Sequence, residues 1–153
     1  MLILPGAAAL SPFRVQRLLS RLGGEAAGIH AVHARFVHFV DVERPLSLDE
    51  RQVIDALLEY GPRRAAVREE GELFLVVPRP GTLSPWSSKA TDIVHNAGLT
   101  RVTRVERGVA YYVATSTPLD AAGRLRVAAH LHDRMVEAVL DSLDEASQAF
   151  VQG

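Results

Sequence analysis

The chain of 153 residues has a formal net charge of −1 at pH 7, with 48% apolar and 23% charged residues, as in ordinary globular domains. It has no cysteine, which excludes disulfides, thiolate metal sites and a cysteine nucleophile within these residues. The balanced charge argues against a nucleic-acid partner and against an anionic lipid surface.

The first residues, Met1 to Pro5, are apolar but lack the basic start of a signal peptide and end at a proline. We therefore expect a short strand there. No apolar run in the sequence approaches the ~20 residues that a membrane span requires. We expect no membrane partner and a cytoplasmic location.

Two helices are predicted in the first half of the chain. Ser11 is an N-cap candidate, and Pro12 suits the first helical position, where a missing N–H costs nothing. Ser47 opens a second helix with the S-x-x-E spacing of a capping box. The helical period predicts which side chains face the core. They are Val15, Leu18, Leu19 and Leu22 in the first helix, and Val53, Ile54, Leu57 and Leu58 in the second.

Two further helices are predicted in the second half. Ser84 and Pro85 repeat the cap and the first-turn proline, and Gly98 is the candidate for the left-handed residue that ends this helix. The fourth helix starts near Asp120. The expected core sides are Trp86, Ala90, Ile93, Val94 and Ala97 in the third helix, and Leu125, Ala128, Leu131, Met135, Val139 and Leu143 in the fourth.

The segments between these helices are rich in β-formers. Residues 72–78 read as one strand, and residues 29–42 and 100–116 each read as a pair of strands. In the later pair the turn is expected at Glu106-Arg107-Gly108. The earlier pair lacks a glycine there, and a milder bend is expected near Ala34-Arg35.

The chain resembles a tandem duplication. Four matches share an offset of 73 residues: Leu2-Ile3-Leu4-Pro5 with Leu75-Val76-Val77-Pro78, Leu10-Ser11-Pro12-Phe13 with Leu83-Ser84-Pro85-Trp86, Phe39-Val40 with Tyr112-Val113, and Pro45-Leu46 with Pro118-Leu119. Ala27-Gly28-Ile29 and Val32 match Ala97-Gly98-Leu99 and Val102 at an offset of 70. We predict an α+β fold of two ferredoxin-like β-α-β-β-α halves, with antiparallel sheets packed against helices. Residues 1–62 and 72–145 would be the halves of a single domain, joined by a connector over 63–71.

The loop before the third helix concentrates polar groups in one half only. Three serines and Lys89, the one lysine among 17 basic residues, follow Gly81 and converge on a helix N-terminus, which can hold an anion. The first half has Arg14-Val15-Gln16 at the matching place, so we favour a contact with another domain over a role in folding. The candidate contact residues are Arg79, Thr82, Ser84, Trp86, Ser87, Ser88, Lys89 and Asp92, with a pair between Lys89 and Asp92.

No catalytic or metal-binding set of residues is predicted. His30 and His33 point to opposite faces of a strand, and His130 and His132 lie about 200° apart on a helix. No serine stands in a nucleophile elbow. The aromatic strands with Tyr111 and Tyr112 suggest an RNA-binding sheet, but the basic-aromatic motif is missing, and core packing is the preferred interpretation.

The segment Pro78 to Asp92, PRPGTLSPWSSKATD, identifies a family. Together with Leu10-Ser11-Pro12-Phe13 and His132-Asp133-Arg134-Met135, it resembles the N-terminal domain of phosphoribosylformylglycinamidine synthase, the large single-chain formylglycinamide ribonucleotide amidotransferase of purine biosynthesis. In that family the domain looks like two fused protomers of the small subunit PurS. The resemblance covers nearly the whole chain.

The resemblance implies that catalysis lies elsewhere. The family's full-length enzyme uses ATP, Mg²⁺ and glutamine, and this chain has neither a cofactor of its own nor a phosphate-binding loop. We expect a piece of a longer protein that assembles the synthetase and glutaminase domains and couples them for ammonia transfer. A regulatory module that binds a small ligand between its halves is the alternative, and self-association of an isolated domain also stays open.

Overall fold

The computed structural model describes residues 1–26, 28–59 and 69–151. Its elements are β1 (Leu2–Ala8), α1 (Pro12–Leu22), β2 (Ile29–Val42), α2 (Leu48–Leu57), β3 (Glu72–Pro78), α3 (Pro85–Asn96), β4 (Val102–Thr115), α4 (Ala121–Leu131), β5 (Glu137–Leu140) and α5 (Leu143–Val151). The predicted connector lies largely outside these residues. The strands form one antiparallel sheet in the order β1-β2-β4-β3-β5.

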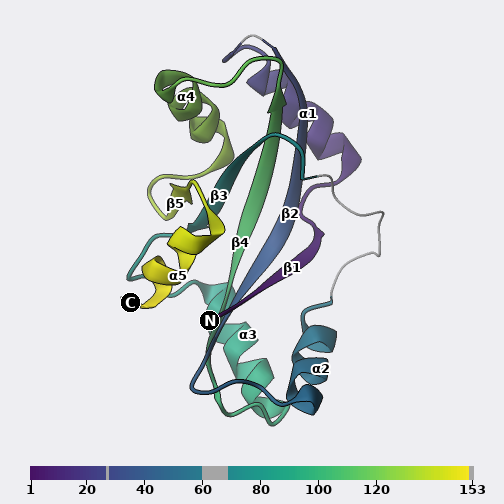
Figure 1. The fold of residues 1–153 in the computed structure, drawn as a ribbon, viewed down its shortest axis with the longest axis vertical. Coiled ribbons are helices and arrows are strands. Elements are labelled where there is room, and N and C mark those ends of the chain that lie inside the picture. Colours follow the sequence, from purple (N-terminus) through teal and green to yellow (C-terminus); the bar gives the residue numbers. More distant parts are fainter. Residues whose placement is uncertain (27, 60–68, 152–153) are drawn as a thin grey trace.

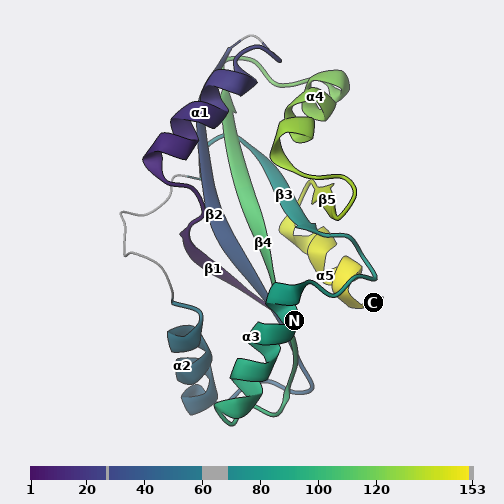
Figure 2. The same cartoon turned by 180° about the vertical axis from the view of Figure 1, so that it is seen from behind.

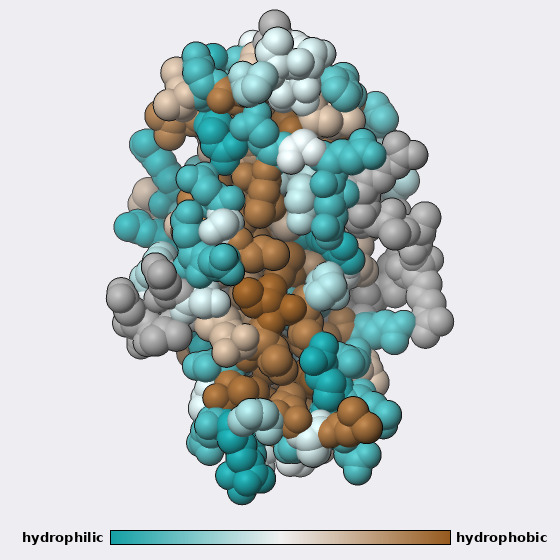
Figure 3. All heavy atoms as spheres, viewed as in Figure 1, coloured by the Kyte–Doolittle hydropathy of each residue, from teal (hydrophilic) through white to brown (hydrophobic). Residues whose placement is uncertain are grey.

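In the described part of the chain, α1 to α4 pack on one face of the sheet and α5 packs on part of the other. Figures 1 and 2 view the sheet from opposite sides: α1 and α4 lie at one end, α2 and α3 lie at the other, and α5 lies on the face seen in Figure 1. Two apolar clusters fill the space under the helices, one around Leu18, Val32 and Val127 and one around Val40 and Val94. A third cluster packs under α5, and Figure 3 shows an apolar band running down this face between polar flanks.

The helix ends form as their sequences predict. Ser11 and Ser84 accept the backbone N–H groups of Arg14 and Ser87, at 3.3 and 3.0 Å. Ser47 and Glu50 form the predicted capping box, with bonds of 3.1 and 2.9 Å. Local side-chain acceptors satisfy orphan amides here, which is why these boundaries are readable from sequence.

Gly98 also acts as predicted. With φ of 93° it ends α3, donating to the carbonyl of His95 at 2.9 Å, while Leu99 donates to that of Val94 at 3.2 Å. Leu99 and Val94 are both buried in the same apolar cluster. This is a Schellman motif with its usual hydrophobic contact.

The α+β fold with a duplicated antiparallel arrangement is confirmed, but the predicted turn at Glu106-Arg107-Gly108 is wrong. β2 and β4 are uninterrupted strands of 14 residues each, so the first half reads β-α-β-α, and the second half repeats this order and adds β5 and α5. They pair with each other from Ile29↔Thr115 to Val42↔Val102, so each satisfies the backbone groups of the other along its whole length. No bend occurs near Ala34-Arg35 for the same reason.

The duplication is visible in the strand register. β2 and β4 begin and end at residues offset by 73, and the terminal pairs Ile29↔Thr115 and Val42↔Val102 are equivalent under this offset, so a twofold rotation relates residues offset by 73. The predicted equivalence of Val32 with Val102 is therefore wrong. Leu2 pairs with Val40, and Glu72 pairs with Val113, the counterpart of Val40. β1 and β3 are therefore related by an offset of 70. The Leu-x-x-Pro segments matched in the sequence are thus three residues out of structural register. The extra residues lie in the loop 79–84, which is longer than the loop 9–11.

The fourth helix is shorter than predicted. α4 ends at Leu131 because His132 takes an extended conformation, with φ of −146°, and the chain then adds β5 to the free edge of β3. A sheet edge left without hydrogen bonds favours such an addition. The core positions predicted for Leu125 and Met135 are wrong, since these side chains are 74% and 75% exposed. Val139 and Leu143 belong to β5 and α5 instead.

Two other predicted core faces need correction. In α3, Val94 is buried, whereas Ile93 is 47% exposed and Ala97 is also exposed. In α2, Ile54 is buried but Val53 is 38% exposed. Both helices therefore leave part of their apolar stripe in contact with solvent.

Gly108 provides a test of the packing between the strands. A Cβ atom there would lie 2.8 Å from the Val76 carbonyl oxygen and 3.2 Å from the Phe39 ring. We expect Gly108→Ala to lower the free energy of unfolding by about 1–3 kcal/mol in urea titrations. The reason is that the Val76 carbonyl belongs to the backbone of β3 and cannot move aside as the end of a flexible side chain can. Gly23→Ala is the control: its φ of −59° is helical and its Cβ would meet ordinary contacts, so stability should stay equal or rise. Equal stabilities for both variants would contradict the close approach.

Candidate functional site

The loop 79–84 and the start of α3 are joined to β4 by side-chain hydrogen bonds. Ser84 Oγ, while capping α3, donates to Glu106 Oε1 at 2.9 Å. Ser87 Oγ donates to the carbonyl of Val105 at 2.6 Å, and Thr91 Oγ1 accepts the N–H of Val105 at 3.1 Å. The two central serines of the predicted site therefore fix the helix on the strand.

Glu106 is the centre of this network. Its side chain is 2% exposed and accepts from Arg104 Nη2 at 2.9 Å and from the N–H of Arg107 at 2.9 Å, besides the bond from Ser84. Arg104 Nη2 also donates to the carbonyl of Thr82 at 2.9 Å. A buried carboxylate with its charge compensated and its oxygens bonded can hold a loop in one position.

A second set of contacts stacks a cation between aromatic rings. The guanidinium carbon of Arg107 lies 4.4 Å from the ring centre of Phe36 and 4.6 Å from that of Trp86. Trp86 also stacks on His38, with ring centres 5.9 Å apart and planes at 27°. Trp86 is half-buried and held in place by these contacts.

His38 is buried beneath this stack, with 1% of its surface exposed. Burial and the neighbouring charge of Arg107 lower the pKa of His38 from 6.5 to about 4, although a hydrogen bond with the backbone of Leu4 opposes the shift. The ring is therefore neutral at physiological pH. The sequence analysis assigned it no role.

The predicted contact residues divide into two groups. Ser84, Trp86 and Ser87 are used inside the domain, and Ser87 is completely buried. The exposed members are Arg79, Thr82, Ser88, Lys89 and Asp92. Among the described residues, no ion pair joins Lys89 to Asp92.

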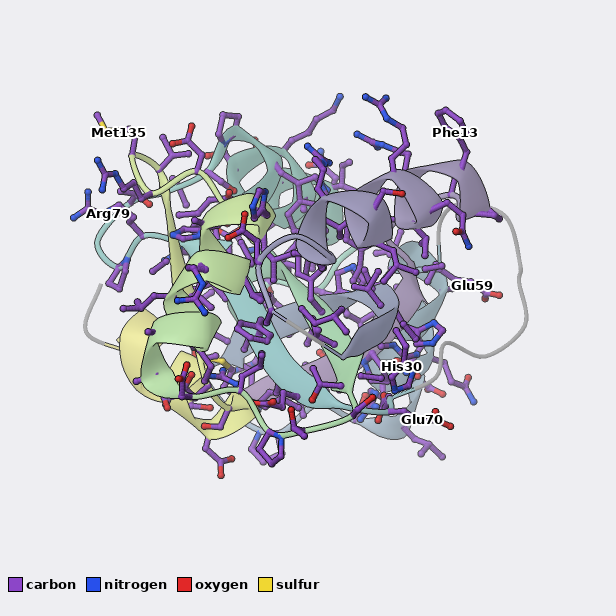
Figure 4. All side chains as sticks on the ribbon, turned by 90° about the horizontal axis from the view of Figure 1, so that it is seen from above. Phe13, His30, Glu59, Glu70, Arg79 and Met135 are labelled. Carbon is purple, nitrogen blue, oxygen red and sulfur yellow. The ribbon has the colours of Figure 1, made fainter. Side chains whose placement is uncertain are left out.

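A second loop lies beside Arg79. The N–H of Arg79 donates to the carbonyl of Val136 at 3.0 Å, and Figure 4 shows Arg79 and Met135 at the same corner of the molecule. Asp133 shapes this loop, because its Oδ1 accepts the N–H of Met135 at 3.0 Å. Met135 and Val136 remain 75% and 58% exposed, so the corner combines apolar and cationic side chains.

The equivalent corner of the first half lacks the polar network. The twofold places His33 at the position of Glu106, Ala31 at that of Arg104 and Arg14 at that of Ser87. Phe13, the counterpart of Trp86, is 70% exposed. One scaffold therefore carries the network in one half only.

The helix N-terminus of α3 is not suited to a phosphate. The N–H of Ser87 is taken by Ser84 Oγ, and that of Ser88 bonds the Ser84 carbonyl at 3.1 Å. The buried carboxylate of Glu106 stands beside them and would repel an anion. The first turn of α3 is therefore a poor match for an anion.

The described residues contain no group of three His, Asp or Glu side chains arranged to hold a metal ion. His130 Nε2 lies 2.9 Å from Glu25 Oε1, and this pair joins α4 to the loop after α1. None of the described helices has the length and apolar character needed to cross a bilayer.

Sequence reasoning missed Glu106, Arg104 and Arg107, which it placed at or near a turn. A signal was present: these three charged residues interrupt a strand in which valine and other β-formers predominate. Charged residues at buried strand positions require partners, and the nearest polar segment in the sequence is the serine-rich loop.

These features define a duplicated α+β domain in which Arg104, Glu106 and Arg107 of β4 make internal contacts. Residues 35–150, well over half of the chain, match the family described as formylglycinamide ribonucleotide amidotransferase N-terminal. The chain belongs to this family, which gives it a role in purine biosynthesis. Because the family is one domain of a multidomain amidotransferase, the domain's neighbours are other parts of that enzyme.

The Glu106 network yields a stability prediction. Glu106→Gln keeps the shape but removes the charge that Arg104 faces and puts a donor where an acceptor is needed. We expect the free energy of unfolding to fall by about 2–3 kcal/mol in urea titrations. Asp92→Asn, on the exposed side of α3, should change it by less than about 0.5 kcal/mol. Similar losses in both variants would show that the bonds of Glu106 add no more to the free energy of unfolding than an exposed side chain does.

His38 yields a pH prediction. Its pKa is lower in the folded than in the unfolded protein, so the unfolded chain takes up the proton first as pH falls below 6.5. Stability should decrease by about 3 kcal/mol between pH 6.5 and 4 from this residue alone. The NMR signal of His38 Cε1 should titrate near pH 4 if the protein stays folded, and a midpoint near 6.5 would refute the assignment.

Proposed function

We propose that this domain is a non-catalytic coupling module of a formylglycinamide ribonucleotide amidotransferase. It docks the glutaminase domain against the synthetase domain and helps to close the path of ammonia between them. ATP and Mg²⁺ would belong to the synthetase domain, and no chemical step is proposed for this chain. A cytoplasmic location goes with this proposal.

The observation that carries the proposal is the asymmetry of the two halves. Only the second half has the longer loop 79–84, and only there does a buried carboxylate hold the loop against β4. If the loop served folding alone, the first half would need a comparable network, and its counterpart positions carry His33 and Ala31 instead. A rigid, exposed loop is suited to contact another domain without a large loss of conformational entropy on binding.

The exposed side chains of this corner match the surface that such a contact requires. Arg79 and Lys89 are cations in solvent, and Leu83, Met135 and Val136 are 61%, 75% and 58% exposed. An apolar centre with a polar rim is the usual arrangement of a stable interface. We therefore assign the contact to the loops 79–84 and 132–136 and to the exposed side of α3.

Reconstitution tests the proposal. The chain is supplied in trans to a synthase that begins after the position of Gly153, and product formation is followed with glutamine and separately with free ammonia. We expect the chain to restore turnover with glutamine while the rate with ammonia stays unchanged. If neither rate responds to the chain, the coupling role is refuted.

Substitutions then localise the contact. We expect Arg79→Ala combined with Lys89→Ala to lower glutamine-dependent turnover about tenfold, since each charge on an interface rim contributes up to about 1 kcal/mol. The ammonia-dependent rate should not change. Arg51→Ala is the control, because Arg51 pairs with Asp55 on the far side of α2. An equal effect of Arg51→Ala would remove the contact from this corner.

A further inference from the structure

A hollow of about 320 Å³ separates α2 from α3. α2 belongs to the first half of the duplication and α3 to the second, and both lie at the same end of the molecule (Figure 1). The hollow is lined by Leu57, Leu58, Trp86, Lys89, Ala90, Ile93, Val94 and Arg107. Its volume is at the lower end of the range of small-molecule sites, about 300–1,000 Å³.

The lining combines apolar walls with positive charge. Among the described residues, the charged side chains of its lining are Lys89 and Arg107, both cationic. Arg107 is held against Phe36 and Trp86, so its position is fixed before any ligand arrives. Lys89 is exposed, and in the described part of the chain no carboxylate pairs with it. Such a site is complementary to an anion that has an apolar body.

At the opposite end of the molecule lie α1 and α4, the twofold equivalents of α3 and α2, and the space between them is closed. There His130 of α4 bonds Glu25 at 2.9 Å, and Arg126 Nε donates to the carbonyl of Glu25 at 3.0 Å. Leu22 and Leu131 are buried between the same elements, with 0% and 7% exposed. The space between α1 and α4 is therefore filled and tied.

The other end differs in the part of the chain that the structure describes. Within the described residues, no hydrogen bond or ion pair joins α2 to α3. Ile93, on the α3 wall, is left 47% exposed. The twofold relates Ile93 to Ser20 and Arg107 to Ala34, so the apolar wall and the fixed cation are particular to the open end.

We infer that the hollow between α2 and α3 is a binding site for a small monocarboxylate with an aliphatic or aromatic body. The carboxylate would lie toward Lys89 and Arg107, and the apolar part would contact Leu57, Ile93 and Val94. A phosphate group fits less well, because the apolar walls offer it no hydrogen bonds. Lys89 belongs both to this hollow and to the proposed contact surface, but the inference concerns a different kind of partner, and its test uses this chain alone with a small probe.

Tryptophan fluorescence of the full chain tests the inference, because Trp86 is the one tryptophan and lines the hollow. The probe is octanoate, and octanamide is its neutral counterpart of equal size. We expect a saturable change with octanoate and binding of octanamide that is about tenfold weaker, because the amide cannot pair with the two cations. Equal binding of both probes, or no saturation with octanoate, would overturn the proposal.

Variants confirm the location. Lys89→Gln should weaken octanoate binding about threefold to tenfold and leave octanamide binding unchanged. Ile93→Glu should abolish octanoate binding by placing a like charge in the wall. Val53→Glu is the matched control, since Val53 is also a partly exposed residue, on α2, and does not line the hollow. Circular dichroism checks that each variant is folded.

The pattern across variants separates this site from other occupants. If Lys89→Gln leaves octanoate binding unchanged, or if Val53→Glu abolishes it, the assignment to this hollow is wrong. Saturation by an acidic amphipathic peptide without saturation by octanoate would also overturn it, and would indicate a partner segment instead.

Discussion

The pairing of β2 with β4 is the constraint on which the rest of this structure depends. These two 14-residue strands run antiparallel side by side, and the rotation that exchanges them relates the whole first half to the second. Each helix reaches the sheet at a place fixed by this pairing, with α1 and α4 at one end and α2 and α3 at the other. A turn within either strand would remove the backbone bonds that hold the halves together. The absence of a break at Gly108 is therefore a central feature of the fold.

Glu106 is the point at which the second half departs from this symmetry. Its buried carboxylate can be tolerated only because Arg104, Ser84 and the N–H of Arg107 all bond to it. The same bonds fix the loop 79–84, which carries three residues more than its counterpart. A cost in desolvation is thus offset by contacts that hold one loop rigid. The first half has no such loop to hold, and His33 stands there in place of the acid.

The two proposed surfaces share this origin. The rigid loop presents Arg79 at a corner with Met135, where a neighbouring domain can dock. On the other side of α3, Arg107 is fixed between aromatic rings and faces the hollow next to α2. Burial and the nearby charge of Arg107 also keep His38 neutral, because a charged ring there would lose its solvation and meet a like charge. The charged residues Arg104, Glu106 and Arg107 of β4 therefore shape the surface on both sides of α3.

What the sequence by itself determined was local. Ser11, Ser47 and Ser84 specify helix starts and Gly98 specifies a helix end, because each satisfies backbone groups within a few residues of itself. The family and the duplication were also readable, since both rest on residue patterns. Only the tertiary structure decided that β2 and β4 are continuous, that β3 is displaced by three residues, and that α4 gives way to β5. It also decided that Glu106 joins Ser84. Each of these depends on which distant backbone or side-chain group is available as a hydrogen-bond partner, and no pattern along the chain contains that information.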